Sequence, residues 1–234
     1  MNSRDLGPGI ALAITALMAI ALFPAAAWAD GPGYTYVGAS YEWTDVKYGV
    51  NPGVDENFNY GKFEGANIDA SLGILGFMHI NAQVFSGDCL GCGTDSSGAE
   101  FDQDFTAYKI GLGFNLGLDL IGLDENTDVI FRGNFIDVDM DSQTQGSITD
   151  DGWSGEALVR SQISDRAEVM VGFEYQDIGQ VSNSDVLVGL GYQVGAGVTL
   201  TASAIVFDND TGFDLGIRWY FGKLLFGDRD SIVR

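Results

Sequence analysis

Apolar and polar residues alternate one by one along most of the chain. Between residues 211 and 221, for example, every second side chain is apolar: Phe213, Leu215, Ile217, Trp219 and Phe221. Small or polar residues stand between them. A period of two is typical of a β-strand with one apolar and one polar face. This stretch therefore predicts a strand that lies between an apolar and a polar environment.

The same alternation occurs in nine further segments. The ten predicted strands cover residues 34–44, 61–74, 78–84, 108–116, 129–135, 153–163, 167–176, 186–194, 198–206 and 211–221. The connections after the second, sixth and eighth strands are short. Those after the seventh and ninth are short as well, so the alternation of short and long connections weakens near the C-terminus. Two of the long polar connections are predicted at residues 87–102 and between Asp137 and Asp151. Short turns on one side and longer loops on the other are typical of an up-and-down barrel whose short turns face the periplasm.

The N-terminus has the pattern of a secretory signal. Arg4 precedes an apolar run at residues 10–23, and Ala27-Trp28-Ala29 follows as an A-x-A cleavage site. The run is too short for a membrane-spanning helix, which needs about 20 apolar residues. We therefore predict that residues 1–29 are a signal peptide that is removed on export.

The chain is strongly acidic, with a formal net charge of −22. Such a chain does not bind nucleic acid through a basic patch. The acidic residues are concentrated between the alternating segments, which predicts acidic loops that face solvent.

Both cysteines of the chain, Cys89 and Cys92, lie in the first long polar connection. Disulfides persist in exported proteins, so a disulfide between them is the favoured hypothesis. A redox dithiol would need a βαβ context, and a zinc site would need more ligands than two cysteines and the distant His79. Free thiols remain an alternative.

The strands are predicted to close into a barrel that crosses a membrane. No segment after the signal approaches the length of a spanning helix, and in lipid only helices and closed barrels satisfy their backbone groups. Two belts of aromatic side chains are predicted: Tyr41, Trp43, Tyr108, Trp153 and Tyr175 near the outer rim, with Tyr192, Trp219 and Phe221 near the inner rim. A soluble sandwich gives no reason for such belts. The predicted fold is an all-β, closed antiparallel up-and-down transmembrane β-barrel of about ten strands, with eight or twelve as alternatives.

Charged residues on the polar face would point into the lumen. They are Asp69, Lys109, Arg132, Glu156, Arg160, Glu168, Glu174, Asp214 and Arg218. Five acids and four bases are close to balance, which predicts an internal ion-pair network because unpaired charges in a narrow lumen are costly. On the opposite face, Leu112 and Val171 are predicted to contact lipid.

The spacing Asp214-x-Gly216-x-x-Trp219-x-Phe221 is similar to the closing-strand signal by which outer-membrane barrels are handed to their assembly machinery. Together with the signal peptide and the strands, it makes the chain resemble the small outer-membrane β-barrel proteins of Gram-negative bacteria, the OmpA/OmpX-like and opacity-type class. The resemblance implies a monomer in the cell outer membrane that contacts the bilayer, lipopolysaccharide and the barrel assembly machinery. Members usually end at the terminal Phe, whereas this chain continues, so we predict a barrel domain at residues 30–221 and a short tail at 222–234.

Catalytic motifs are weak in this sequence. Barrel enzymes need a histidine with a serine or acidic partner, and the single histidine, His79, follows a predicted periplasmic turn on the lumen face. We therefore expect neither an enzyme nor a cofactor. Weak binding of divalent cations is a further hypothesis for two acidic stretches, one with Asp137, Asp139 and Asp141 and one with Asp208 and Asp210. Two functions remain: a structural or surface-interaction barrel with a charge-plugged lumen, and alternatively a narrow channel for small solutes or ions.

Overall fold

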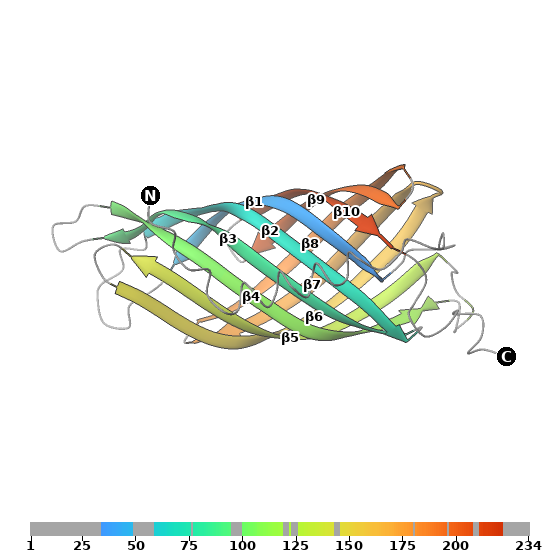
Figure 1. Ribbon diagram of the computed structural model, residues 1–234, viewed down its shortest axis with the longest axis horizontal. Helices are drawn as coiled ribbons and strands as arrows, with labels where there is room; N and C mark the ends of the chain where they lie inside the picture. Colours follow the sequence, from blue (N-terminus) through green and yellow to red (C-terminus); the bar gives the residue numbers. More distant parts are fainter. Residues whose placement is uncertain are drawn as a thin grey trace.

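Ten antiparallel strands close into one barrel, as the prediction stated (Figure 1). The computed structural model describes residues 34–48, 59–75, 77–94, 100–118, 122, 126–142, 146–179, 181–195, 197–207 and 211–221. The strands are β1 (Tyr36–Tyr48), β2 (Asn59–Leu75), β3 (Met78–Thr94), β4 (Glu100–Gly117), β5 (Thr127–Ser142), β6 (Gly146–Ser164), β7 (Ala167–Ile178), β8 (Val181–Gly195), β9 (Val198–Phe207) and β10 (Thr211–Tyr220). Each strand pairs with its neighbours in sequence.

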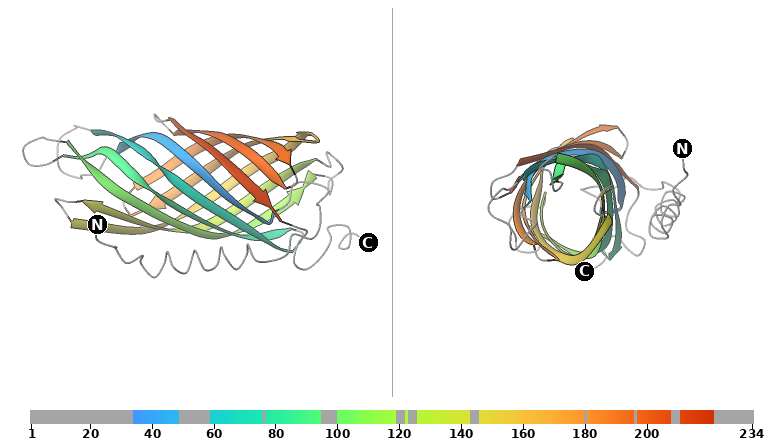
Figure 2. Two further views of the ribbon diagram at one scale, coloured as in Figure 1. Left: turned by 45° about the horizontal axis from the view of Figure 1, so that its top comes forward. Right: turned by 90° about the vertical axis from the view of Figure 1, so that its left-hand side faces the viewer.

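The barrel closes where β1 pairs with β10. Tyr36 lies opposite Tyr220 on one side and opposite Ser71 of β2 on the other, so the first strand has a partner along both edges. Figure 2 shows the resulting ring from the end of the barrel. Closure leaves no open sheet edge, which a strand structure within lipid requires.

The two faces of the barrel wall differ as the alternation predicts. Leu112 and Val171 are about half exposed on the outside, at 49% and 51%. Their neighbours Gly113 and Gly172 face the lumen, where an added Cβ would overlap His79 and Leu158 respectively. The outer face is therefore apolar, and the lumen face carries glycines and polar side chains.

The two ends of the barrel can be told apart by their connections. We call the end where β1 begins and β10 ends the terminal end, and the opposite one the distal end. Two-residue turns join β2 to β3, β6 to β7 and β8 to β9 at the terminal end. Gly197, in the last of these turns, has a φ of 71°, which favours glycine. We expect the terminal end to face the periplasm, because short turns lie on that side in such barrels.

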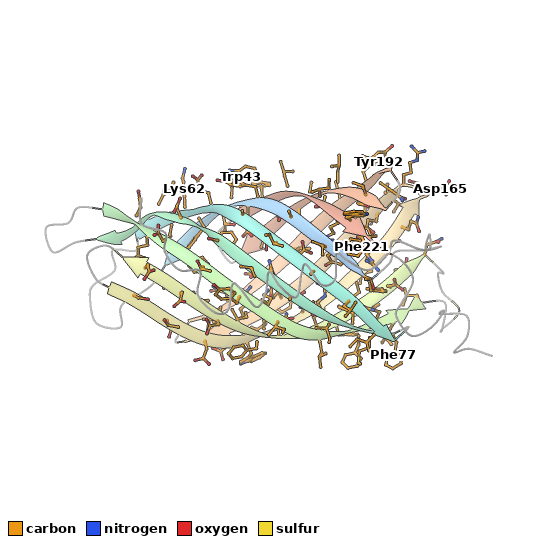
Figure 3. The ribbon with its side chains drawn as sticks, in the orientation of Figure 1. Trp43, Lys62, Phe77, Asp165, Tyr192 and Phe221 are labelled. Atoms are coloured by element: carbon orange, nitrogen blue, oxygen red, sulfur yellow. The ribbon has the colours of Figure 1, made fainter. Side chains whose placement is uncertain are left out.

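Aromatic side chains gather near both ends. Ring pairs form between Tyr41 and Trp43 and between Trp153 and Tyr175, with centroids 4.7 and 5.4 Å apart. In Figure 3, Trp43 and Lys62 lie toward the distal end, while Phe77, Asp165, Tyr192 and Phe221 lie toward the terminal end. This arrangement fits amphipathic rings at two membrane interfaces. No helix within the described residues is long and apolar enough to cross a membrane.

Several strands extend farther at the distal end than predicted. The predicted loop at 87–102 is wrong in extent, because β3 continues to Thr94 and β4 begins at Glu100. The predicted loop between Asp137 and Asp151 is also wrong, because both residues lie within strands and pair with each other. Likewise, β8 begins at Val181, five residues before the start of the strand predicted at 186–194. Polar composition suggested loops here, but a strand beyond the bilayer can be polar on both faces.

Some predictions fall outside the described residues. These are the signal peptide at 1–29, the tail at 222–234 and the acidic pair Asp208 and Asp210. They stay predictions.

Candidate functional site

The middle of the lumen is crossed by a layer of ion pairs. Lys109 Nζ of β4 lies 2.6 Å from Glu174 Oε1 of β7 and 3.7 Å from Glu156 Oε1 of β6. Arg132 Nη1 of β5 lies 3.0 Å from Glu156 Oε2. Asn134 donates a 2.8 Å hydrogen bond to Glu156 Oε1. Glu156 is therefore the centre of this layer, in contact with side chains from β4 and β5.

A second ion pair joins strands on either side of β1. Arg218 Nε of β10 lies 3.5 Å from Asp69 Oδ2 of β2. Both side chains pass over Gly38 of β1, where an added Cβ would overlap Asp69 and crowd Arg218. The guanidinium of Arg218 also lies 4.9 Å from the ring centroid of Tyr36, within cation–π distance. The glycine in β1 thus makes the approach of β10 and β2 side chains possible.

The terminal end of the lumen is covered by Tyr34, which lies just before β1. Its hydroxyl donates a 2.6 Å hydrogen bond to Asp128 Oδ2 of β5. Its ring stacks on His79 of β3 at 5.4 Å, and the guanidinium of Arg160 lies 4.4 Å from its centroid. Arg160 Nη2 in turn lies 3.4 Å from Asp128 Oδ2. We call Tyr34, His79, Asp128 and Arg160 the terminal floor.

Both the burial and the contacts of His79 indicate a packing role. Its exposed fraction is 0%, and its Nε2 accepts a 3.3 Å hydrogen bond from Arg132 Nε. The terminal floor is thereby connected to the ion-pair layer. His79 thus contacts Arg132 of β5 and the ring of Tyr34.

The distal half of the lumen contains apolar side chains that the alternation did not predict. Phe105 packs edge-on against Phe63 and Phe85, with centroids 4.9 and 5.7 Å apart. Cys89 and Ile136 are buried on the same face of the wall, at 1% and 3% exposure. We call Phe63, Phe85 and Phe105 the distal aromatic cluster. This cluster narrows the lumen beside β2, β3 and β4.

A cavity of about 170 Å³ remains in the lumen, and residues from all ten strands border it. Small residues on β8 and β9, among them Gly189, Gly191 and Ser203, are part of its lining. Six acidic and three basic side chains line the cavity. The lining is therefore acidic, in contrast to the near balance that the sequence suggested.

The structure brings most of the predicted lumen residues together and differs in their partners. Arg160 pairs with Asp128, which was not among the predicted residues, rather than with Glu168. Arg218 pairs with Asp69 rather than with Asp214, whose Oδ1 accepts a 3.3 Å hydrogen bond from Ser203. Sequence reasoning missed Asp128 because it is the second residue of β5 and follows a connector without alternation. Position 128 does share the even parity of Arg132, which could have identified it.

Two further predicted groups are placed in part. Asp214 and Gly216 face the lumen, and Trp219 is 53% exposed on the outside, where its ring contacts Phe221 at 5.3 Å. Cys89 lies in β3 and is buried, whereas the side chain of Cys92 lies outside what the structure describes. The disulfide between Cys89 and Cys92 therefore stays a prediction.

Solved structures similar to this chain are membrane barrels. An outer membrane channel from Pseudomonas putida F1 is 10% identical, with a TM-score of 0.51 over 80% of this chain and 96% of that chain. The translocator domain of the autotransporter NalP from Neisseria meningitidis is 13% identical, with a TM-score of 0.46 over 91% and 98% of the two chains. Neisserial surface protein A is 12% identical, with a TM-score of 0.40 over 82% and 100%. At this identity, the similarity to the channel shows the fold alone.

No curated protein matches the sequence. Residues 15–193, well over half of the chain, match the sequence family described as the outer membrane protein beta-barrel domain. The closed barrel and its apolar outer face agree with that match. The chain therefore belongs to the outer membrane protein beta-barrel domain family and is a protein of the outer membrane.

Proposed function

We propose that this barrel has a structural or surface-interaction role in the outer membrane and that its lumen is closed to solutes. The observation that carries the proposal is the succession of three layers along the lumen. The distal aromatic cluster, the ion-pair layer around Glu156 and the terminal floor follow one another from the distal to the terminal end. Each layer is held by side chains from different strands, so a solute would have to displace several contacts at once.

Liposome swelling tests this proposal. Purified barrel is refolded into liposomes, and the influx of glycine and of arabinose is followed by light scattering. We expect rates equal to those of protein-free liposomes. Swelling that depends on the amount of barrel would contradict a closed lumen.

A narrow channel for small solutes or ions is the second candidate. The cavity and the excess of acidic over basic side chains in its lining favour it, because a predominance of one sign of charge is typical of a selective pathway. Swelling with glycine but not with arabinose would support this candidate over the first.

The surface that would meet other molecules is the outward face near the distal end. Glu64, Asp88, Asp104 and Asp141 lie opposite one another on the four neighbouring strands β2 to β5. We propose that this acidic row contacts lipopolysaccharide, with weakly bound divalent cations between the carboxylates and the lipid phosphates. Like charges on adjacent strands repel, and a cation would reduce that repulsion. Removal of divalent cations by a chelator should therefore lower the temperature at which the barrel unfolds.

The remaining expectations are part of the same proposal. The barrel acts as a monomer and without catalysis, and the contacts of His79 to Arg132 and Tyr34 support a structural role for the histidine. The barrel assembly machinery inserts the barrel into the membrane. It recognises Trp219, near the end of β10, and Phe221, which follows that strand. Crosslinking in native membranes, which would trap an oligomer if one formed, tests the monomer.

A further inference from the structure

The lumen cavity has more negative charge than its basic side chains compensate. Its basic residues, Lys109, Arg132 and Arg218, pair with Glu156, Glu174 and Asp69. The other three carboxylates that line it are those of Glu42, Glu168 and Asp214. None of these three forms an ion pair within the part of the chain that the structure describes. Charge that is removed from bulk water without a partner is unfavourable, so this excess calls for a counterion.

Two of the three carboxylates are direct neighbours. Glu42 of β1 and Asp214 of β10 are partners in the strand register, and both face the lumen. Thr44 donates a 3.0 Å hydrogen bond to Glu42 Oε1, and Ser203 donates one of 3.3 Å to Asp214 Oδ1. These bonds hold the carboxylates on the cavity wall. Like charges directly opposite on adjacent strands destabilise a sheet.

An independent observation at the same cavity also indicates a missing partner. Asn67 of β2 lines the cavity and is only 7% exposed. Its side-chain oxygen has no hydrogen-bond partner among the described residues. Asn67 pairs with Ser40 of β1. Ser40 is the lumen-facing residue next to Glu42 on that strand, toward the terminal end. A buried amide oxygen of this kind accepts either a hydrogen bond or a cation.

We propose that the cavity binds one small cation between Glu42 and Asp214, with the amide oxygen of Asn67 as a further ligand. Carboxylate and amide oxygens are the ligands that hard cations prefer, so Na⁺, K⁺ and Ca²⁺ are the class of ligand. A cavity of about 170 Å³ also has room for the cation and several waters, since one water needs roughly 10–15 Å³. The proposal goes beyond the closed lumen, because a bound cation stabilises the barrel whether or not it passes through.

Thermal unfolding of the barrel in liposomes tests the cation site. Melting is followed by heat-modifiable gel mobility in NaCl, KCl, CaCl₂ or N-methyl-D-glucamine chloride at equal ionic strength. A ligand that binds the folded state raises its melting temperature with concentration. We expect the wild type to melt at a higher temperature in at least one of the three small-cation salts than in glucamine chloride. The salt that gives the highest melting temperature identifies the cation.

The variants distinguish the site from general screening. Glu42→Gln with Asp214→Asn should abolish the wild-type difference between glucamine and Na⁺ or K⁺, and it should reduce the difference for Ca²⁺, to which the outer acidic row also contributes. The double variant should melt higher than the wild type in glucamine chloride because the repulsion is gone. Asp165→Asn, in the exposed β6–β7 turn, should keep the wild-type dependence. If the double variant does not fold, Glu42→Gln alone provides the same comparison. The proposal is overturned if the wild type does not distinguish the cations, or if the Glu42 variants keep the full dependence of the wild type. Liposome swelling is unaffected by either result, so a closed lumen is tested separately.

Discussion

Replacement of Glu156 by Gln is the most informative single change in the lumen. The amide keeps the shape of the side chain and an acceptor for Asn134, and it removes only the charge. Arg132 Nη1, at 3.0 Å, then loses its ion-pair partner. Lys109 keeps Glu174 at 2.6 Å. The perturbation is thus one uncompensated guanidinium in the middle of the barrel.

The expected cost follows from the burial of the pair. The side chain of Glu156 is 10% exposed and that of Arg132 is 19% exposed. Breaking a buried pair by removing one partner costs about 3–5 kcal/mol. Because the adjoining cavity has room for water, some screening remains, and we expect about 3 kcal/mol. This is a large fraction of the stability of a typical folded domain.

Urea unfolding in lipid vesicles, followed by tryptophan fluorescence, measures this cost. Arg132→Met removes the other charge, and the double variant should cost less than the sum of the two single changes by more than about 1 kcal/mol. Asp165→Asn is the surface control, with an expected change within about 0.5 kcal/mol. A Glu156→Gln barrel as stable as the control would refute the view that the layer is buried and coupled.

Three further predictions concern the wall and its ends. Leu112→Arg places a charge in lipid and should cost about 2–4 kcal/mol in the same unfolding assay; refolding as efficient as the wild type would contradict its outward position. Cys89 and Cys92 should resist alkylation in the unfolded, unreduced protein, as measured by intact mass; two added labels would rule out the disulfide. Phe221→Ala should lower the amount of barrel in the outer membrane fraction, whereas an unchanged amount would argue against an assembly role.

The wall of the barrel was predictable because a lipid environment imposes a strict rule on sequence. Residues such as Leu112 and Val171 must be apolar, and Gly113 and Gly172 must leave room for lumen side chains. The alternation that results is visible without any structure. The alternation identified all ten strands, and Leu112 and Val171, which it placed on the outer face, are about half exposed there.

Prediction was weaker where that rule does not apply. Beyond the bilayer both faces of a strand meet polar surroundings, so the region around Asp137 and Asp151 was interpreted as a loop although it is strand. Inside the lumen, apolar packing at Phe105 and Ile136 runs against the alternation. The partners of Arg160 depend on two features of the fold. One is the register that brings β5 beside β6, and the other is the position of Tyr34, which precedes β1. The sequence pattern indicates neither of them.

Closure of the lumen is the central claim, and planar-bilayer conductance tests it most directly. Wild-type barrel inserted into a bilayer should give no steady current. Tyr34→Ala with Arg160→Ala removes the tyrosine ring and the guanidinium from the terminal floor, and we expect this variant to admit small currents. Steady conductance of the wild type at the level of a general porin would contradict the claim.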